Sequence, residues 1–216
     1  MPGLEEYLRG IEEHHFGGTC YALNSHLNDP LLHLGYDARL CGADMSAPDV
    51  HVANIVSVEG REFIVDVGYA APFVAPLPRD RATDFEILHG ADRYVLKPQD
   101  EAGNSLMELH RDGVLSHRYL LKPASRAIGE FASVVAESYA PDATFMNAIL
   151  LARYGTDASV VIRNLDLIRT ARGVSSRRRL AGKEELVDAV HREFRIEPKI
   201  VEAAVAGLMP GLDAWG

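Results

Sequence analysis

One hairpin constrains the fold of this chain more than any other feature of its sequence. Two apolar segments, HVANIVSV at 51–58 and REFIVDV at 61–67, flank the dipeptide Glu59-Gly60. Short segments rich in Val and Ile around a two-residue turn predict an antiparallel β-hairpin. Such a turn pairs Val58 with Arg61, and this pair fixes the register of both strands.

The register predicts that a histidine and an aspartate lie together. His51 is expected opposite Gly68, and Asp66 opposite Ala53, so His51 and Asp66 share one face as diagonal neighbours about 6–8 Å apart at the backbone. One extra residue in the turn would put them on opposite faces. Asp66 interrupts the apolar run FIVDVGY. Gly68 opposite His51 would leave space above the imidazole ring.

The rest of the chain predicts an α+β fold, with helical periodicity at both ends and strand patterns between them. We expect a short N-terminal helical part at 1–35, a central antiparallel β-barrel or sheet at 36–124, and a C-terminal α/β part at 125–216. Pro30 should stop or kink the second helix, or begin another turn. The expected helices lie near 4–11, 20–27, 128–135, 183–194 and 199–208, and the further strands near 36–41, 93–97, 105–111, 114–122, 145–153 and 159–165.

Composition excludes several classes of protein. The 216 residues carry a formal net charge of −9, which argues against nucleic acid or an anionic membrane surface as a partner. No apolar run approaches the roughly 20 residues of a membrane helix, and the acidic N-terminus does not look like a signal peptide. Two cysteines do not make a disulfide framework, so we expect a cytoplasmic protein with free thiols.

Cys20 is the candidate nucleophile. In the segment FGGTCYALN it follows Gly17-Gly18, with Thr19 as the N-cap of a predicted helix. A helix N-terminus favours a thiolate, and its N–H groups can stabilise an oxyanion. A cysteine nucleophile needs a base and an orienting group, which His51 and Asp66 would supply. The local sequence alone leaves open a buried packing cysteine, as we expect for Cys41.

Several motifs in order resemble the arylamine N-acetyltransferase family. FGGTCYALN resembles the family signature RGGxCxELN, and LLHLGYDARL resembles the segment that follows it. The hairpin resembles H-x-x-L-x-V…Y-x-V-D-V-G-F-G. Two later segments, SYAPDATFMNAILLAR and LAGKEELVDAVHREFRI, are also similar to family motifs. The resemblance runs from about Phe16 to Ile196.

This resemblance implies a helical bundle, a β-barrel and an α/β lid around a cysteine-protease-like triad. Cys20 would be the acyl-accepting nucleophile, His51 the base and Asp66 its orienting carboxylate. The function implied is transfer of an acetyl or other acyl group from a thioester to an amine through a thioacyl-cysteine intermediate. Coenzyme A thioester would be a co-substrate, with no tightly bound cofactor. The residues expected to contact substrate are Tyr69, which stands where the family has a Phe, Tyr21, Gly68 and Phe16.

The sequence also departs from the family pattern. Only nineteen residues precede Cys20, the signature arginine is Phe16, the glutamate is Ala22, and the glycine after the aromatic residue is Ala70. A second subunit or a carrier protein could cover the shortened N-terminal part. An amide synthase that uses a larger or carrier-bound acyl chain is therefore the main alternative. A transglutaminase-like hydrolase and an inactive binding protein are less favoured.

Two further clusters are not expected to form sites. His14, His15, His26 and Cys20 are metal-ligand types, but their spacing fits no zinc pattern, so no metal is expected. The run at 177–179, Arg-Arg-Arg, could bind coenzyme A phosphates but is expected in a solvated loop.

Overall fold

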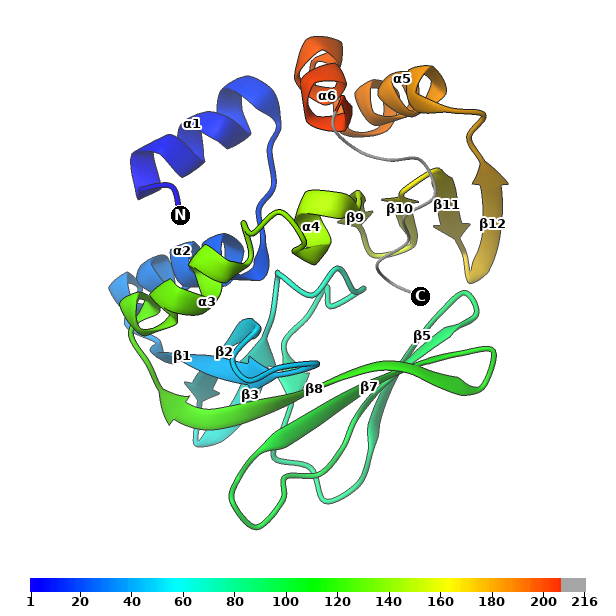
Figure 1. The fold of residues 1–216 in the computed structure, drawn as a ribbon. Helices are drawn as coiled ribbons and strands as arrows, with labels where there is room; N and C mark the ends of the chain where they lie inside the picture. The colour runs from blue at the N-terminus through cyan, green and yellow to red at the C-terminus, as the bar shows by residue number, and fades with distance from the viewer. Residues whose placement is uncertain (207–216) are drawn as a thin grey trace. The chain divides into compact units, whose positions relative to one another are not determined.

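The computed structural model, which describes residues 1–206, has helices near both ends of the chain and two antiparallel sheets between them in the sequence (Figure 1). This α+β architecture agrees with the fold class expected from the sequence. Contacts divide the chain into two compact units, one of Met1 with Gly18–Val135 and one of Pro2–Gly17 with the described part of Ala136–Gly216. The three-segment division expected from the sequence stays a prediction.

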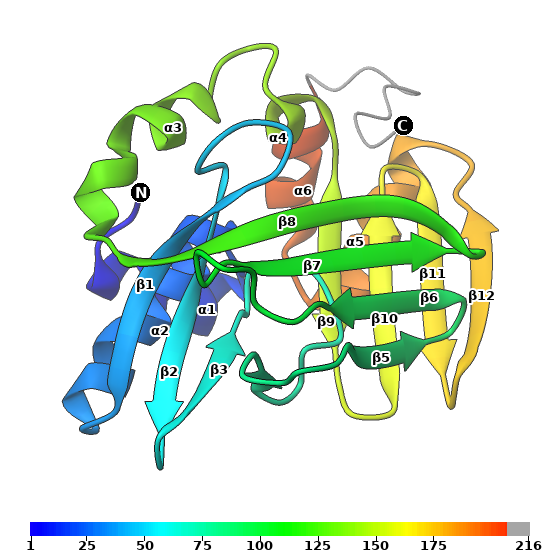
Figure 2. The same ribbon diagram turned by 90° about the horizontal axis from the view of Figure 1, so that it is seen from below.

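The first unit is built on an eight-stranded antiparallel sheet in the order β4-β3-β2-β1-β8-β7-β6-β5. The β1–β3 half runs across the direction of the β5–β8 half, so the sheet curls into a nearly closed barrel (Figure 2). Its strands are β1 (Asp37–Asp44), β2 (His51–Val58), β3 (Arg61–Val65), β4 (Leu77–Pro78), β5 (Phe85–His89), β6 (Asp92–Leu96), β7 (Ser105–Arg111) and β8 (Val114–Ser125).

The register predicted for the β2–β3 hairpin is confirmed. Val58 pairs with Arg61 and Asn54 pairs with Val65. Glu59 and Gly60 have φ values of 52° and 77°, the left-handed conformation that both residues of a tight hairpin turn adopt. The turn therefore has no extra residue, and the side chains of the two strands share faces as the sequence predicted.

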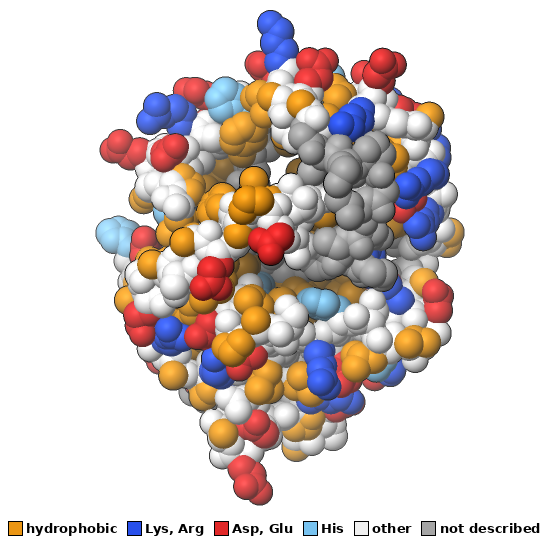
Figure 3. All heavy atoms as spheres, viewed as in Figure 1, with side chains coloured by type: hydrophobic (Ala, Val, Ile, Leu, Met, Phe, Trp, Pro, Cys, Tyr) orange, Lys and Arg blue, Asp and Glu red, His pale blue; other side chains and the backbone are white. Residues whose placement is uncertain are grey.

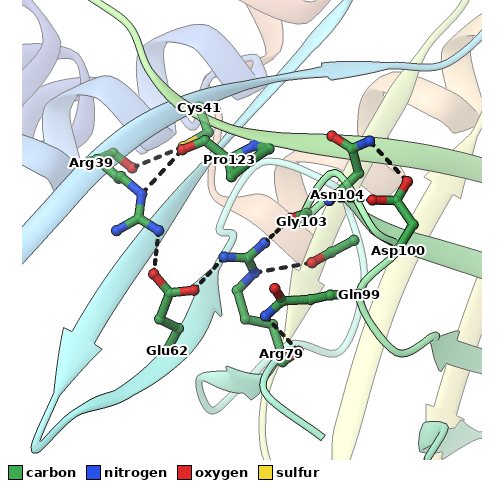
Figure 4. Close-up of polar contacts among 10 residues, drawn as sticks. Arg39, Cys41, Glu62, Arg79, Gln99, Asp100, Gly103, Asn104 and Pro123 are labelled. Atoms are coloured by element: carbon green, nitrogen blue, oxygen red, sulfur yellow. Dashed lines mark hydrogen bonds and ion pairs between the residues drawn. The ribbon is translucent and has the colours of Figure 1, made fainter. Parts of the chain in front are cut away.

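An ion-pair network around the buried side chain of Arg79 joins β1, β3 and β7 (Figure 4). Arg79, at 2% exposure, donates from Nη1 to Glu62 Oε2 at 2.5 Å and from Nε to Ser105 Oγ at 3.0 Å. Its Nη2 donates to the carbonyl of Gly103, and Arg39 donates to the second oxygen of Glu62. The network links the β4 side of the sheet to the start of β7 and helps to close the barrel.

Helix α2 (Cys20–His33) packs on β1 and β2 and begins at Cys20, as predicted. The helix does not stop at Pro30, so that prediction was wrong, but the alternative that Pro30 begins another turn agrees with the continuation of α2 to His33. Pro30 lies in the last turn, where its missing N–H costs a single intrahelical bond. Its carbonyl still accepts from the N–H of Leu34 at 2.9 Å. The chain then continues from β8 into the 3-10 helix η1 (Ile128–Phe131) and α3 (Ala132–Glu137).

The second unit packs helices against a four-stranded sheet in the order β12-β11-β10-β9. Residues 145–147, expected as part of a strand, lie in helix α4, and the 177–179 arginines lie in β12 rather than in a loop. Asp166 binds Arg177 and Arg179, and Glu185 binds Arg178. The elements are α1 (Leu4–His14), α4 (Thr144–Asn147), β9 (Leu150–Tyr154), β10 (Ala158–Arg163), β11 (Asp166–Ala171), β12 (Val174–Arg179), α5 (Lys183–Phe194) and α6 (Pro198–Val205).

Acidic and basic side chains are mixed with apolar ones on the face drawn in Figure 3. Among residues 1–206, no helix combines the length and apolar character needed to cross a bilayer. The last residues of the closing helix expected at 199–208 lie outside the described part of the chain.

Candidate active site

Cys20 is the first residue of α2 and is partly exposed. Thr19 precedes it with extended backbone angles, φ −73° and ψ 168°, as an N-cap residue has. The first N–H groups of a helix lack intrahelical partners and form its positive end. The Sγ atom lies 4.0 Å from the carbonyl oxygen of Val50, one residue before β2. The thiol is therefore at a helix N-terminus and close to the start of the strand that carries His51.

His51 and Asp66 are in direct contact. The Nε2 atom of His51 lies 2.8 Å from Oδ2 of Asp66, and the two residues are 2% and 4% exposed. His51 begins β2, and Asp66 comes directly after β3. Because Nε2 faces the carboxylate, Nδ1 is the nitrogen left for chemistry on the other side of the ring.

The charged forms of both residues are stabilised despite their burial. Burial disfavours the imidazolium, but the Asp66 carboxylate and the Cys20 thiol outweigh it and raise the pKa of His51 above its ordinary value. Burial likewise disfavours the carboxylate, but His51 and the hydrogen bonds from Asn24 and Gly68 lower the pKa of Asp66. The pair can hold a proton on the imidazole while the carboxylate stays ionised.

Asn24 is one of the residues of this site that the sequence analysis missed, with Tyr119 and His117. It lies one turn after Cys20 on α2 and is fully buried. Its Nδ2 donates to Asp66 Oδ1 at 3.0 Å and to the carbonyl of Val52 at 2.8 Å, while its Oδ1 accepts from the N–H of Val67 at 3.1 Å. Asn24 thus fixes the carboxylate to the helix that carries the thiol. A polar residue four positions after the cysteine was the signal available in the sequence.

Gly68 lies against the helix N-terminus. A Cβ atom at this position would come within 2.5 Å of the Cα of Cys20 and 2.7 Å of Asn24 Nδ2. The N–H of Gly68 donates to Asp66 Oδ1 at 2.9 Å. Glycine is therefore required for the close approach of this loop to α2. The sequence analysis had assigned Gly68 the space above His51 and a place among the expected substrate contacts, and the contact with substrate stays a prediction.

Aromatic rings surround the imidazole of His51. The rings of Tyr119 and Tyr69 lie 5.0 Å and 5.8 Å from it. Tyr119 is fully buried, and burial followed by the charge of Asp66 raises its pKa well above the ordinary value. Tyr69 also forms a hydrogen bond of 2.7 Å between its hydroxyl and Nδ1 of His117. The hydroxyl of Tyr69, a residue expected to contact substrate, therefore has a partner within the protein.

The remaining predicted contact residues are Tyr21 and Phe16. Tyr21 is 5% exposed and packs with Phe131, and its hydroxyl donates to the carbonyl of Asp49 at 2.9 Å. This placement favours a structural role beside the segment before His51. Phe16 belongs to the other compact unit, where it packs on His14 with ring centroids 5.1 Å apart.

Salt bridges hold the segment that precedes His51. Asp49 accepts from Lys122 at 2.7 Å and from Arg126 at 2.8 Å, and Lys122 also binds Asp44 at 2.7 Å. These ion pairs connect the loop between β1 and β2 to the end of β8. They fix the chain two residues before the imidazole.

Comparison with known proteins adds a family and a fold. The sequence profile of a family described as N-acetyltransferase matches residues 6–202. The arylamine N-acetyltransferase of Salmonella typhimurium is 18% identical, with a TM-score of 0.79 over 95% of this chain and 82% of that chain. That of Mycobacterium marinum, in complex with CoA, is 20% identical, with a TM-score of 0.77 over 94% of this chain and 80% of that chain. At these identities the structural likeness shows the shared fold.

A curated protein matches a shorter part of the sequence. Proansamycin X synthase of Amycolatopsis mediterranei is 39% identical over 69 residues, which are 28% of this chain. The match spans about a quarter of that protein's length, 26%.

Proposed function

The chain belongs to the arylamine N-acetyltransferase family, and from that premise we propose that it transfers an acyl group from a thioester to an amine through Cys20. One observation carries the proposal: a thiol at the N-terminus of α2 lies beside a buried His51–Asp66 pair in one compact unit. This is the set of groups that covalent acyl transfer by a cysteine requires, namely a nucleophile, a base and an orienting carboxylate.

The first half-reaction forms a thioacyl enzyme. The Cys20 thiolate attacks the thioester carbonyl carbon, a new C–S bond forms, and the bond to the carrier thiol breaks. The departing thiolate takes its proton from the His51 imidazolium. N–H groups at the helix N-terminus stabilise the negative charge on the carbonyl oxygen. The raised pKa of His51 supports this step, because it favours the protonated imidazole as the proton donor.

The second half-reaction passes the acyl group to the amine. The amine nitrogen attacks the thioacyl carbon, its proton moves to Nδ1 of His51, and Cys20 leaves as the thiolate. Asp66 stabilises the imidazolium and holds Nε2, so Nδ1 keeps its orientation toward the thiol. Ping-pong kinetics follow from the two separate steps.

Intact-mass measurement after incubation with acetyl-CoA tests the proposal. We expect one acetyl group on the wild type and on Cys41→Ser, and none on Cys20→Ala. Addition of 4-methoxyaniline should then remove the acetyl group and yield the N-acetyl amide. Acetylation of Cys20→Ala to the same extent would contradict the proposal, and release of acetate in place of the amide would favour the hydrolase alternative.

An amide synthase is the second candidate, favoured by the 39% identity to proansamycin X synthase over 69 residues. On this reading the donor is a larger acyl chain, carried by a protein or joined to the amine. Thioesters of N-acetylcysteamine with acetic acid and with a long-chain acid separate the two candidates. Faster acylation of Cys20 by the long-chain thioester would favour the synthase, whereas faster acylation by the acetyl thioester would favour the acetyltransferase.

A further inference from the structure

A second histidine is joined to the candidate site through a tyrosine. His117 lies on β8, and its Nδ1 is 2.7 Å from the hydroxyl of Tyr69, in the loop after β3. The two residues are 48 positions apart in the sequence. At 2.7 Å this is a short, well-formed hydrogen bond between a phenol and an imidazole nitrogen.

Tyr69 connects His117 to the imidazole of the proposed triad. The Tyr69 ring meets His51 edge-on, with centroids 5.8 Å apart and an interplanar angle of 60°. It meets Tyr119 at 4.9 Å and 80°, and its plane is nearly parallel to those of Phe73 and His117 at 5.9 Å and 5.7 Å. The orientation of the Tyr69 ring therefore determines whether its edge or its face lies beside the imidazole of His51.

The backbone around Tyr69 does not belong to a regular strand. β3 ends at Val65 and β4 begins at Leu77. Ala70, the next residue, has a φ of 53° in the left-handed region. Because no ladder of sheet hydrogen bonds sets the direction of this loop, side-chain contacts have to orient the Tyr69 ring.

His117 is suited to hold a phenol. Burial, followed by the charges of His51 and Arg111, lowers the pKa of His117 below its ordinary value. A neutral imidazole offers one nitrogen as an acceptor and the other as a donor, so Nδ1 can accept the Tyr69 proton. His117 pairs with Leu109 of β7 in the sheet, and this pairing fixes the position of its backbone.

We propose that His117 is a positioning residue of the amine half-reaction, which holds the Tyr69 hydroxyl and so fixes the ring beside His51. The inference rests on the proposed function, because the amine must approach the acyl carbon within reach of that imidazole. The first half-reaction needs the thioester, Cys20 and His51. The contribution of His117 therefore appears mainly in the rate at which the amine consumes the acyl enzyme.

Four variants test the inference. His117→Phe and Tyr69→Phe each remove one end of the hydrogen bond, the double variant removes both, and His117→Asn keeps an amide that can bond to the phenol. His110→Phe is the matched control, since this β7 histidine binds Glu108 at 3.1 Å and pairs with Leu115. Cys20 is acylated with p-nitrophenyl acetate in a single turnover, and 4-methoxyaniline is then added at varied concentration.

The expected pattern is specific to positioning. His117→Phe and Tyr69→Phe should each slow the amine step by roughly 3- to 10-fold, the effect of one lost hydrogen bond. The double variant should be no slower than either single variant, because both remove the same contact. His117→Asn should restore most of the rate, and acylation should change far less than the amine step. His110→Phe should match the wild type.

Several outcomes would overturn the inference. Additive losses in the double variant, an unchanged amine rate in His117→Phe, or an equal loss in the acylation step would each do so while leaving the proposed function intact. A wild type that p-nitrophenyl acetate and acetyl-CoA both fail to acylate at Cys20 would overturn the proposed function and this inference with it. The imidazole nitrogen resonances of His117 give an independent readout, and if Tyr69→Phe leaves them unshifted, the inference is overturned.

Discussion

Gly68 packs directly against the backbone of Cys20, so that a Cβ atom on Gly68 would lie 2.5 Å from the Cα and 2.8 Å from the Cβ of Cys20. The same glycine donates its N–H to Asp66 at 2.9 Å. One residue thus sets the spacing between the helix that carries the thiol and the carboxylate that orients the base.

Gly68→Ala should harm both stability and chemistry. The nearest atom that a methyl group would meet is the backbone Cα of Cys20, and Asn24 Nδ2 and Cys20 Cβ lie almost as close. The helix α2 or the loop must therefore move, at a cost of about 1–3 kcal/mol in the free energy of unfolding. A shift of about 1 Å at Cys20 should slow acylation by tenfold or more. Urea unfolding and single-turnover acylation measure the two effects. Gly129→Ala is the control, since nothing lies within 4 Å of its Cβ position, and equal behaviour of the two variants would contradict the prediction.

Cys20 should react with iodoacetamide at neutral pH much faster than Cys41. Cys20 is partly exposed at a helix N-terminus, whereas Cys41 is fully buried, and burial raises the pKa of the Cys41 thiol to about 11. Peptide mapping of the alkylated protein over time gives both rates. Cys20→Ser should lose the fast phase and Cys41→Ser should keep it. Faster labelling of Cys41 in the native protein would remove the case for Cys20 as the nucleophile.

The stabilisation from the His51–Asp66 pair should depend on pH in a defined direction. The pKa of Asp66 is lowered by folding, so its contribution is complete above the ordinary carboxyl value of about 4 and is lost as pH falls through the folded pKa. The pKa of His51 is raised, so its contribution is complete below the ordinary value of about 6.5 and is lost as pH rises through the folded pKa. Unfolding free energies of the wild type and Asp66→Asn should therefore differ most between about pH 4 and 6.5. A difference that is constant from pH 3 to pH 10, by contrast, would show that the pair is not ionised.

The position of the His51–Asp66 pair could be predicted from the sequence because it depends on one hairpin turn and the strand register that the turn sets. The Glu59-Gly60 turn fixes the register, and the register places both residues on one face. The role of Asn24 was harder to predict, because only its spacing from Cys20 indicated that the two residues share a helix face. The contact between Tyr69 and His117 could not be predicted, because it depends on how the loop after β3 lies over β8, 48 residues along the chain.

Two of the elements that the sequence analysis missed, β12 and α4, lack a clear apolar periodicity. Strand β12 reads VSSRRR and is exposed at every position, so no apolar pattern marks it as a strand. It is recognised as a strand in the structure by its pairing with β11. Residues 144–147, Thr-Phe-Met-Asn, form helix α4, although short apolar runs fit strand and helix alike. The Arg177-Arg178-Arg179 run could be recognised as exposed but not as part of a sheet.

Ala70→Gly should stabilise the protein slightly. Ala70 has a φ of 53°, a conformation that costs an L-residue about 1–2 kcal/mol relative to glycine. Glycine also gains conformational freedom in the unfolded chain, and this reduces the stabilisation by about 0.4–1 kcal/mol. Thermal and urea unfolding should show a net gain of about 0.5–1 kcal/mol. Ala71→Gly, whose side chain packs on the core, should lower stability. A loss of stability in Ala70→Gly as large as that in Ala71→Gly would contradict the strain argument.

Arg79→Met should destabilise the barrel strongly. Its guanidinium is 1% exposed and donates to Glu62, Ser105 and Gly103, so methionine leaves these acceptors without their donor. Removing one partner of a fully buried pair costs about 3–5 kcal/mol. Glu62 is partly exposed and keeps its bond from Arg39, so the expected loss is no more than about 3 kcal/mol. The matched control is Arg61→Met, whose solvent-exposed ion pair with Asp80 at 2.8 Å should contribute far less to stability. Urea unfolding of both variants measures the difference, and similar losses in the two would show that the network around Arg79 does not hold the sheet closed.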